Sequence, residues 1–329
     1  MRAVRVLVTG ATGKVGHAVA RALLARGDEV RALVRSGSAA IPAGAEPVRG
    51  DVRDTESLVE AVRGCELVFN AMGLPEQWLP DERTFHEVNA VGSQNVARAA
   101  RAAGVRRLIH TSTIDVFHAD RGARFDESEL ASYPKGTAYE RSKQEAERLV
   151  LDAVGGMDVV MVNPAGVYGP GPAGSASLEE DFFRPLVRGR LPAVPPGGMG
   201  VCFTDGVGAG HLLAAERGRP GERYILCDRH VSMRELAETV VRVAGRGRVP
   251  LGIPPGLARG MAAGGELLSR AIGRPPLLPT GQLHFMLWDA APDSSKAQEE
   301  LGWEPTALDD GVRRTLESMG LVRRRLSAR

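Results

Sequence analysis

VRVLVTGATGKVG, residues 4–16, is an apolar run that passes into a glycine-rich turn and then into an amphipathic stretch. The apolar run 4–8 predicts a first strand, and the spacing of apolar residues over 15–25 predicts a helix. A glycine-rich turn between a first strand and a first helix is typical of sites that bind dinucleotide phosphates. The segment therefore predicts both an architecture of alternating strands and helices and a cofactor site.

The three glycines of this turn have separate expected roles. Gly10 tolerates the positive φ of a tight turn, Gly13 lets the backbone approach a pyrophosphate, and Gly16 allows close packing of helix on strand. The phosphates then lie at the helix N-terminus, where free N–H groups favour negative charge. An ordinary strand-to-helix turn is the alternative, but its place at the first strand favours binding. The predicted phosphate-binding residues are Gly10, Thr12, Gly13, Lys14, Val15 and Gly16.

Strand and helix patterns alternate through the first half of the chain. Short apolar runs predict strands at residues 4–8, 30–34, 46–48, 67–70, 107–110 and 158–162. Amphipathic stretches predict helices at residues 15–25, 55–62, 81–102 and 139–153. Because parallel neighbours need a crossover connection, the alternation predicts an α/β fold with a doubly wound parallel sheet of the Rossmann type. Its ligand is expected at the carboxyl ends of the strands.

The pattern is less regular after Pro164, where glycine and proline become frequent. Helical patterns recur at residues 178–188, 205–217 and 233–244, and residues 223–226 predict a strand that returns to the main sheet. We therefore expect a dinucleotide-binding domain at residues 1–163 and a smaller, irregular α/β substrate lid at residues 164–329, with the segments around 205–226 rejoining the main sheet.

The composition argues against several classes of partner. The 329 residues include 42 basic and 40 acidic side chains, a formal net charge of +2. This balance predicts no nucleic-acid or membrane partner and leaves a small molecule as the expected one. The three cysteines show no metal-ligand spacing, and their odd number suits a reduced cytoplasm. Without a signal peptide or membrane span in the sequence pattern, we expect a cytoplasmic protein with no metal site.

The end of the second strand bears on the choice of cofactor. An NAD enzyme usually offers a carboxylate there to the ribose hydroxyls, but this chain has Arg35, which suits the 2′-phosphate of NADP. The sequence thus favours NADP over NAD, although an exposed arginine can occur by chance in so arginine-rich a chain. Asp51 and the N–H group of Val52 are candidates for the adenine ring, with a plain turn as the alternative.

Tyr139 and Lys143 lie one helical turn apart and so share a helix face. A phenol with a pKa of about 10 is a poor base at neutral pH, but a neighbouring ammonium favours the phenolate. A surface pair is the alternative, yet only four of the 42 basic residues are lysine, so lysine at 143 indicates a chosen titratable amine. The hydroxyls of Thr111, Ser112 and Thr113 are expected to project from the carboxyl edge of the sheet beside this pair.

Together these segments resemble the extended short-chain dehydrogenase/reductase family, in its epimerase/dehydratase and dihydroflavonol-reductase-like branch. The resemblance covers nearly the whole chain and rests on residues 9–16, 50–54, 88–96, 111–113, 139–143, 164–170 and 293–297. It implies that Thr113 binds the substrate oxygen, that Tyr139 exchanges a proton with it, and that hydride passes between the substrate carbon and nicotinamide. It further implies a homodimer formed through residues 81–102 and 139–153.

The resemblance also assigns the remaining cofactor contacts. Pro164 and Val167 would position the nicotinamide carboxamide, and Lys143 would hold the nicotinamide ribose. Further residues expected at the cofactor are Asn70, Ala71, Met72, Thr111 and Tyr139. Asn89, on the following helix, is expected to brace the strand that ends at Asn70 instead of reacting.

Two departures from the family pattern narrow the range of reactions that this chain is expected to catalyse. Dehydratases of the family carry Thr-Asp-Glu where this chain has Thr113-Ile114-Asp115, and many epimerases carry arginine at the position of Asn163. The segment 178–200, expected to face the substrate, offers Phe182, Phe183 and Leu186, with Arg184, Arg188 and Arg190 able to reach a diphosphate. These residues favour oxidoreduction of a carbonyl or alcohol on a hydrophobic molecule. The alternatives are a nucleotide-sugar epimerase with retained NAD and a catalytically inactive dinucleotide-sensing regulator.

Overall fold

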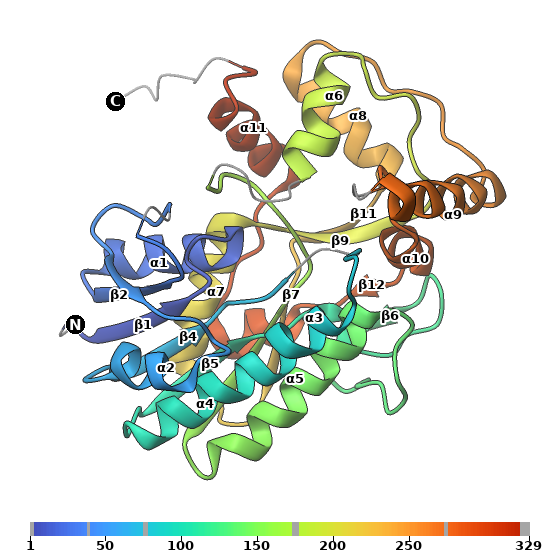
Figure 1. Ribbon diagram of the computed structural model, residues 1–329. Helices are drawn as coiled ribbons and strands as arrows, with labels where there is room; N and C mark the ends of the chain where they lie inside the picture. Colours follow the sequence, from blue (N-terminus) through green and yellow to red (C-terminus); the bar gives the residue numbers. More distant parts are fainter. Residues whose placement is uncertain (1–2, 38–39, 75–77, 173–177, 273–275, 323–329) are drawn as a thin grey trace, which may run out of the picture.

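The computed structural model describes residues 3–37, 40–74, 78–172, 178–272 and 276–322 (Figure 1). Its centre is a seven-stranded sheet in the order β10-β7-β5-β4-β1-β2-β3, in which every neighbouring pair is parallel. The strands are β1 (Arg5–Thr9), β2 (Glu29–Val34), β3 (Glu46–Arg49), β4 (Leu67–Asn70), β5 (Arg107–Thr111), β7 (Asp158–Pro164) and β10 (Arg223–Leu226). The doubly wound parallel sheet predicted from the sequence is confirmed.

Strand order reverses between β1 and β4. From β1 the chain adds β2 and β3 on one side, and it then crosses back so that β4 pairs with the other side of β1. In an open parallel sheet, the crevice for a ligand lies at such a reversal, at the carboxyl ends of the strands. The glycine-rich turn follows β1 and therefore lies at this point.

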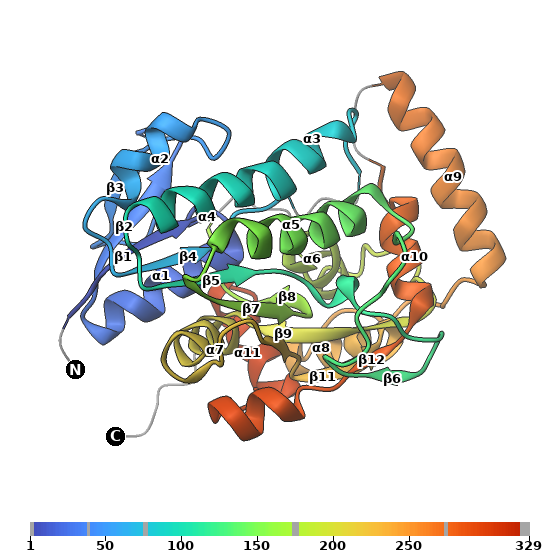
Figure 2. The same ribbon diagram turned by 90° about the horizontal axis from the view of Figure 1, so that it is seen from below.

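Helices cover both faces of the sheet (Figure 2). On one face, α1 (Lys14–Arg26) and α7 (Thr204–Arg217) pack on each other and share an apolar core with the strands. On the other face, α2 (Thr55–Val62), α4 (Ser93–Ala102) and α5 (Ala138–Val154) form a second core. Because both faces are covered, strands such as β4 are buried at every residue, which explains their continuous apolar sequence.

The helix predicted over residues 81–102 is three consecutive helical segments. It begins with α3 (Arg83–Phe85), continues as the π-helical segment η1 (His86–Gly92) and ends as α4. Gly92 lies against Val52, because a Cβ atom built on it would be 2.7 Å from Val52 Cγ2. A hydrophobic repeat predicts a helix here but does not reveal the wider π turns.

The second half of the chain contains more regular structure than its sequence pattern predicts. A three-stranded sheet in the order β11-β9-β8 is formed by β8 (Gly166–Tyr168), β9 (Gly198–Phe203) and β11 (Arg229–Ser232). A two-stranded sheet pairs β6 (Arg124–Phe125), from the first half of the chain, with β12 (Ala291–Pro292). The first half also contains η2 (Ile114–Val116). The further helical segments of the second half are η3 (Glu179–Phe183), α6 (Arg184–Val187), α8 (Met233–Ala244), α9 (Pro255–Ile272), α10 (Thr280–Trp288), η4 (Ala297–Leu301) and α11 (Leu308–Ser318).

This half contributes to the main sheet as well as to a core of its own. The strand predicted at 223–226 is present as β10 and pairs with β7, and α7 packs on α1. The helices α6, α8 and α11 pack together beyond the sheet, around a core that includes Phe183, Phe203 and Leu236 (Figure 1). The proposed division at residues 163 and 164 falls within the last two residues of β7.

Candidate active site

The glycine-rich turn lies against the loop that follows β4. Gly10 has a φ of 72°, and a Cβ atom built on it would be 2.5 Å from the carbonyl oxygen of Ala71. A Cβ atom on Gly16 would be 2.3 Å from the carbonyl oxygen of Gly10. No residue other than glycine fits at these two positions without moving backbone, so turn, loop and helix are fixed close together.

Gly13 differs from the other two glycines because it has space beside it. It is the N-cap of α1, and the nearest atom to a Cβ atom built on it is the carbonyl oxygen of Gly10 at 3.4 Å. The first turn of α1 contains no acidic residue. Among the described residues no side chain caps this helix N-terminus, and the space beside Gly13 fits the pyrophosphate of a dinucleotide.

A buried polar network holds the loop after β4 in place. Thr9 Oγ1 donates to Asn70 Oδ1 over 2.6 Å and accepts from the N–H of Met72 over 3.2 Å. Asn70 Nδ2 lies 3.1 Å from His110 Nδ1. Ala71 and Met72 are thereby placed beside the glycine-rich turn, whereas the side chain of Asn70 is wholly buried in the network.

Asn89 fixes the next part of that loop to α5. Its Oδ1 accepts from the N–H of Leu74 over 2.7 Å, and its Nδ2 donates to Ser142 Oγ over 3.0 Å. Asn89 therefore braces the loop after β4, whereas the sequence analysis expected it to brace the strand itself.

Charged groups gather where β2 and β3 end. Arg35 is exposed after β2, and the Asp51 carboxylate accepts from the Arg53 guanidinium at 2.8 and 3.1 Å. The hydrogen bonds from Arg53, with a smaller contribution from Arg35, lower the pKa of Asp51. Val52 is buried, and its carbonyl oxygen accepts from Asn95 Nδ2 over 3.0 Å. The structure thus brings the expected Arg35, Asp51 and Val52 to one end of the crevice.

The helix α5 positions Tyr139 and Lys143. It begins with a capping box in which Thr137 and Glu140 satisfy each other's backbone N–H groups, so that Tyr139 lies in the first turn. Tyr139 is half-buried, and its ring packs edge-on against Phe85 with centroids 6.2 Å apart. Lys143 is buried one turn further on, as the spacing predicted.

The Lys143 ammonium points at the carboxyl end of β5. Its Nζ donates to the carbonyl oxygen of Thr111 over 2.8 Å. A Cβ atom built on Gly73 would be 3.9 Å from Nζ, so the loop after β4 passes close to the amine. Burial lowers the pKa of Lys143 to about 8, although Glu147 and Asp115 act in the opposite direction.

The hydroxyls after β5 do not all face the crevice as the sequence analysis expected. Thr111 Oγ1 lies 2.9 Å from His211 Nε2, in the interface with α7, because Thr111 still belongs to β5 and its side chain is buried against that helix. Its carbonyl oxygen is the group that meets Lys143. Thr113, beyond the strand, directs its Oγ1 at Asp115 Oδ2, 2.9 Å away.

Asp115 is a buried carboxyl group that the sequence analysis did not assign to the site. Burial and the nearby Glu140 raise its pKa to about 7, while Thr113, Lys135 and Lys143 lower it. The sequence gives one signal that could have identified Asp115 as a site residue. It lies two residues after Thr113, at the start of the segment where the backbone leaves the sheet.

Pro164 is the last residue of β7, the strand next to β5, and Val167 follows it in β8. Asn163 is buried, and its Nδ2 donates to the carbonyl oxygen of Thr113 and to Glu147 Oε1, both over 3.0 Å. The residue that replaces the arginine of many epimerases therefore braces the backbone of Thr113.

Glu179 is a second residue that sequence reasoning missed. Its carboxylate forms an ion pair with Lys14, and both side chains are about nine-tenths buried. The same carboxylate accepts from the N–H of Gly169. The second half of the chain thus reaches the glycine-rich turn through one acidic side chain.

The sequence analysis expected residues 178–200 to present apolar side chains to the substrate, and the structure corrects this expectation. Phe182, Phe183 and Leu186 are buried in the core that they share with α8, so they are not available to a substrate. Arg184 binds Glu180 through two hydrogen bonds of 2.5 and 2.7 Å. Helix periodicity marks apolar residues as buried but does not say whether protein or ligand covers them.

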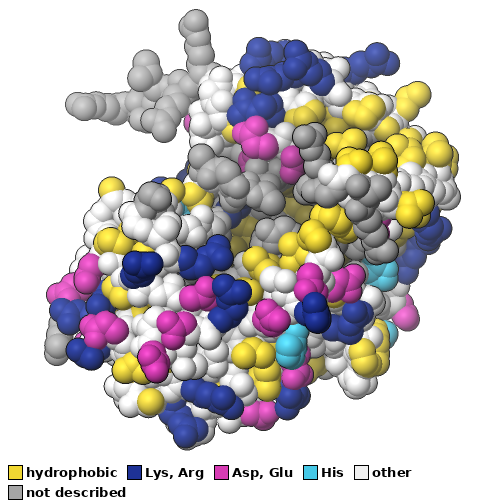
Figure 3. All heavy atoms as spheres, in the orientation of Figure 1, with side chains coloured by type: hydrophobic (Ala, Val, Ile, Leu, Met, Phe, Trp, Pro, Cys, Tyr) yellow, Lys and Arg dark blue, Asp and Glu magenta, His cyan; other side chains and the backbone are white. Residues whose placement is uncertain are grey.

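The surface is hollowed between the main-sheet part of the molecule and the helices of its second half (Figure 3). Hydrophobic side chains are visible on the walls of this hollow. The hollow opens on the side of the molecule where the carboxyl ends of the strands face the second half (Figures 1 and 3).

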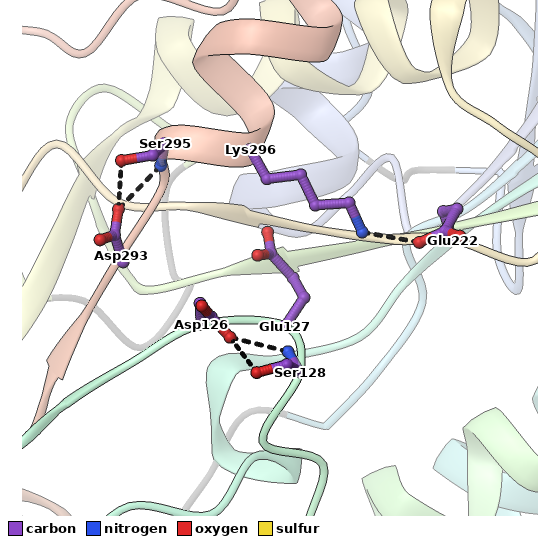
Figure 4. A pocket seen from close by; sticks show the side chains of 7 residues that line it. All are labelled: Asp126, Glu127, Ser128, Glu222, Asp293, Ser295 and Lys296. Atoms are coloured by element: carbon purple, nitrogen blue, oxygen red, sulfur yellow. Dashed lines mark hydrogen bonds and ion pairs between the residues drawn. The ribbon is translucent and has the colours of Figure 1, made fainter.

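Residues 293–297, one of the segments that carry the family resemblance, lie away from the candidate active site and have a structural role (Figure 4). A pocket of about 380 Å³ is lined by Asp126, Glu127, Ser128, Glu222, Asp293, Ser295 and Lys296. Lys296 Nζ binds Glu222 over 2.7 Å and lies 5.0 Å from the ring centroid of Tyr224. These contacts attach the C-terminal segment to the outer strand β10, and none of the predicted site residues lines the pocket.

The described residues offer neither a metal centre nor a membrane-spanning helix. Among them, no group of histidine, cysteine and acidic side chains is arranged to hold a metal ion. In the same part of the chain, no helix has the length and apolar character needed to cross a bilayer.

Known proteins share both this sequence pattern and this fold. The model of the NAD dependent epimerase/dehydratase family matches residues 6–226. Sterol demethylase protein B of Methylococcus capsulatus is 35% identical, with 92% of this chain and 94% of that protein covered. The 4-hydroxy-2-methyl-3-oxo-4-farnesyl-3,4-dihydroquinoline-1-oxide ketoreductase of Stigmatella aurantiaca is also 35% identical, covering 97% of this chain and 92% of that protein.

Among solved structures, UDP-glucose 4-epimerase of Thermotoga maritima superposes with a TM-score of 0.78 at 20% identity, covering 96% of this chain and 98% of that one. At that identity the likeness concerns the fold. The chain belongs to the NAD dependent epimerase/dehydratase family, which confirms the resemblance to extended short-chain dehydrogenases/reductases. It is an NAD(P)-dependent enzyme of the dehydrogenase, reductase or epimerase type.

Proposed function

We propose that this enzyme transfers hydride reversibly between a nicotinamide dinucleotide, with NADP preferred, and a carbonyl or alcohol group of a hydrophobic small molecule. One observation carries the proposal. The buried Lys143 amine and the Thr113 hydroxyl lie at the carboxyl end of β5, with Tyr139 one helical turn from Lys143. This set adjoins the loop that contacts the glycine-rich turn.

The residues divide the work between proton transfer and positioning. In the reducing direction the Tyr139 hydroxyl gives its proton to the substrate oxygen, and in the oxidising direction the phenolate takes it back. The Lys143 ammonium favours the phenolate by its charge, which brings the phenol toward a useful acidity. Thr113 holds the same substrate oxygen. The dinucleotide, when bound, supplies or accepts the hydride.

The cofactor site is assigned to residues already described. Gly10, Thr12, Gly13, Lys14, Val15 and Gly16 would hold the pyrophosphate. Ala71 and Met72, fixed by the Asn70 network, would lie under the middle of the dinucleotide, and Lys143, which binds the Thr111 carbonyl oxygen, would support the nicotinamide ribose. Arg35 favours NADP because its exposed guanidinium offers charge-assisted hydrogen bonds to a 2′-phosphate.

Support for a hydrophobic substrate comes from the relatives and from the hollow. The names of the two most similar relatives reported above refer to a sterol and to a farnesyl-bearing ketone. The arginines proposed for a sugar diphosphate offer less support, since Arg184 is already bound to Glu180. A ketone reductase is therefore preferred over a nucleotide-sugar epimerase. The homodimer and the cytoplasmic location stay predictions that derive from the family and the sequence.

The test is to follow oxidation of NADPH and NADH by the purified full chain with three ketones: cholest-4-en-3-one, ethyl 2-methylacetoacetate and dihydroquercetin. Deuteride supplied at nicotinamide C4 should appear on the carbinol carbon of the product. An enzyme that instead retains NAD, interconverts uridine diphosphate sugars and consumes no added dinucleotide would be an epimerase. Dinucleotide binding without turnover of ketones or of these sugars would favour the inactive sensing regulator.

A further inference from the structure

We propose that Asp115 sets the direction of the Thr113 hydroxyl, and so decides whether Thr113 can donate a hydrogen bond to the substrate oxygen. Asp115 is here a positioning residue, since it acts through Thr113 and does not touch the substrate. The inference rests on the proposed function, because it concerns the same substrate oxygen.

The geometry leaves little freedom to the Thr113 hydroxyl. Its Oγ1 lies 2.9 Å from Asp115 Oδ2 and accepts from the N–H of Asp115 over 3.3 Å. Both side chains are only 6% exposed. Among the described residues, Asp115 Oδ1 is buried and has no hydrogen-bond partner. The Asp115 carboxyl group is thus held beside the Thr113 hydroxyl through Oδ2, while its Oδ1 has no partner among the described residues.

A threonine hydroxyl has one proton to donate and two lone pairs to accept with. When Asp115 is ionised, the proton must go to Oδ2, because a carboxylate can only accept. One lone pair then takes the Asp115 N–H, and Thr113 has no proton left for the substrate oxygen. In the ionised state only Tyr139 can exchange a hydrogen bond with that oxygen.

Protonation of Asp115 reverses this arrangement. The carboxyl proton now donates to Thr113 Oγ1, and together with the Asp115 N–H it fills both lone pairs. The Thr113 proton is released to donate to a ketone oxygen. In this state Thr113 and Tyr139 together present two donors to the carbonyl group, which is what its reduction requires.

The groups around Asp115 allow both states near neutrality. The segment η2, which contains Asp115, packs on α5, from which Glu140 and Lys143 face it, and Lys135 faces it from the loop before α5. Lys135 is engaged elsewhere, since its Nζ donates to the carbonyl oxygen of Phe117 over 2.9 Å and lies 3.8 Å from Glu140 Oε1. Burial and Glu140 raise the pKa of Asp115 to about 7.

The proton balance of the reaction is unchanged by this switch. Reduction of a ketone takes up one hydride at carbon and one proton at oxygen, and that proton comes from Tyr139. The Asp115 proton moves neither to substrate nor to solvent during the step. It only changes which atom of the Thr113 and Asp115 pair is the donor.

The first test needs no substrate. In protein labelled with ¹³C at threonine Cβ, the Thr113 resonance, assigned by its loss in Thr113→Ser, is followed from about pH 5 to about pH 9. We expect it to shift with a midpoint near the Asp115 pKa in the native enzyme and to stay constant in Asp115→Asn. The control is Asp228→Asn, which alters a half-buried carboxyl whose pKa is also raised, to about 6, and should leave the Thr113 titration intact.

Either of two results overturns the proposal: a native Thr113 resonance that does not titrate, or a titration that persists in Asp115→Asn. The native measurement alone can decide against it, so the test holds even if the variant does not fold. Because this readout requires no turnover, it is independent of the proposed function, whose own failure would appear as absence of ketone reduction.

The second test applies to the ketone that the enzyme reduces. In the native enzyme, kcat/KM for reduction should fall roughly tenfold as pH rises through the Asp115 pKa. A change of roughly tenfold corresponds to the free energy of about one hydrogen bond. Asp115→Asn, which is neutral throughout, should lose this dependence. An unchanged pH profile in Asp115→Asn, with Asp228→Asn as the matched control, contradicts the switch.

Discussion

Lys14 and Glu179 form a buried ion pair that connects the glycine-rich turn with the second half of the chain, although 165 residues separate them in sequence. Glu179 also accepts from the N–H of Gly169. The Glu179 carboxylate therefore binds both the glycine-rich turn, through Lys14, and the start of the loop after β8, through Gly169. The pair thus adds a buried link between the two halves to the pairing of β10 with β7 and the packing of α7 on α1.

Removal of one partner of the pair should be costly. Lys14→Met leaves the Glu179 charge buried without its cation, and we expect the free energy of unfolding to fall by roughly 3 kcal/mol. The double variant Lys14→Met/Glu179→Gln should recover part of this loss, because no charge is left unpaired. Urea unfolding measures both. Arg234→Met, which breaks an exposed pair with Glu238, is the control and should cost no more than about 0.5 kcal/mol. Equal effects of Lys14→Met and Arg234→Met would contradict the importance of the buried pair.

Tyr139→Phe tests the proton-transfer role directly. Loss of the hydroxyl should lower kcat by roughly 10²-fold to 10⁴-fold while NADPH affinity, measured by fluorescence titration, stays the same. Tyr133→Phe is the matched control, because Tyr133 is exposed and its hydroxyl binds His118 over 2.7 Å. Near-native turnover by the Tyr139 variant would remove Tyr139 from the mechanism.

Arg35 is expected to determine cofactor preference. In Arg35→Glu a negative charge replaces the cation proposed for the 2′-phosphate, so KM for NADPH should rise by roughly tenfold or more, with KM for NADH little changed. Arg63→Glu, at an exposed arginine paired with Glu60, controls for the change in net charge. Parallel increases in KM for both dinucleotides would show that Arg35 does not read the phosphate.

His211 should make the fold sensitive to acid. Burial lowers its pKa to about 4, below the ordinary 6.5, so the unfolded chain binds this proton more readily than the folded one. Its contribution to stability is therefore complete above about pH 6.5 and is lost as pH falls toward 4. His211→Gln, which keeps an acceptor for Thr111 and a donor for the Val207 carbonyl oxygen, should lose less stability on acidification, as measured by urea unfolding at several pH values. The same pH dependence in both proteins would assign the acid sensitivity elsewhere.

Asp115 should have the opposite effect on the pH dependence of stability. Its pKa is raised from 3.8 to about 7, so the folded state holds the proton more tightly and stability falls as pH rises through this interval. Asp115→Asn carries no such charge, and its melting temperature relative to the native enzyme should increase between about pH 5 and about pH 8. A constant difference across this range would mean that Asp115 is already ionised at low pH.

The sequence predicts the main sheet well because most of its strands are buried on both faces and therefore read as apolar runs, whereas the edge strand β3 is buried only at Val48. Residues 223–226 illustrate this, since the run predicts β10 at its observed bounds. The second sheet is harder to predict, because β9 contains glycines at 198 and 200 that are imposed by close neighbours. A Cβ atom built on Gly200 would be 2.7 Å from Pro292, a residue that comes near only in the folded chain.

The candidate site shows the same division. Tyr139, Lys143 and the glycine-rich turn depend on local spacing, so their arrangement can be predicted from the sequence. The partners of Thr111 and Lys14 cannot, because His211 and Glu179 lie far along the chain and carry no local pattern. Even for Asp115, two residues from Thr113, the protonation behaviour depends on Glu140 and on burial that only the fold creates.

The place of β10 in the main sheet has a consequence for how the protein is made. A nascent chain that has emerged from the ribosome only as far as Pro164 lacks the strand that pairs with β7 and the helix α7 that covers α1. Its outer strand and an apolar helix face are then open to neighbouring chains, which is the situation that chaperones relieve. Synthesis must pass Leu226 before the nucleotide-binding half can close, so a gene fragment that ends at the apparent domain boundary should yield insoluble product.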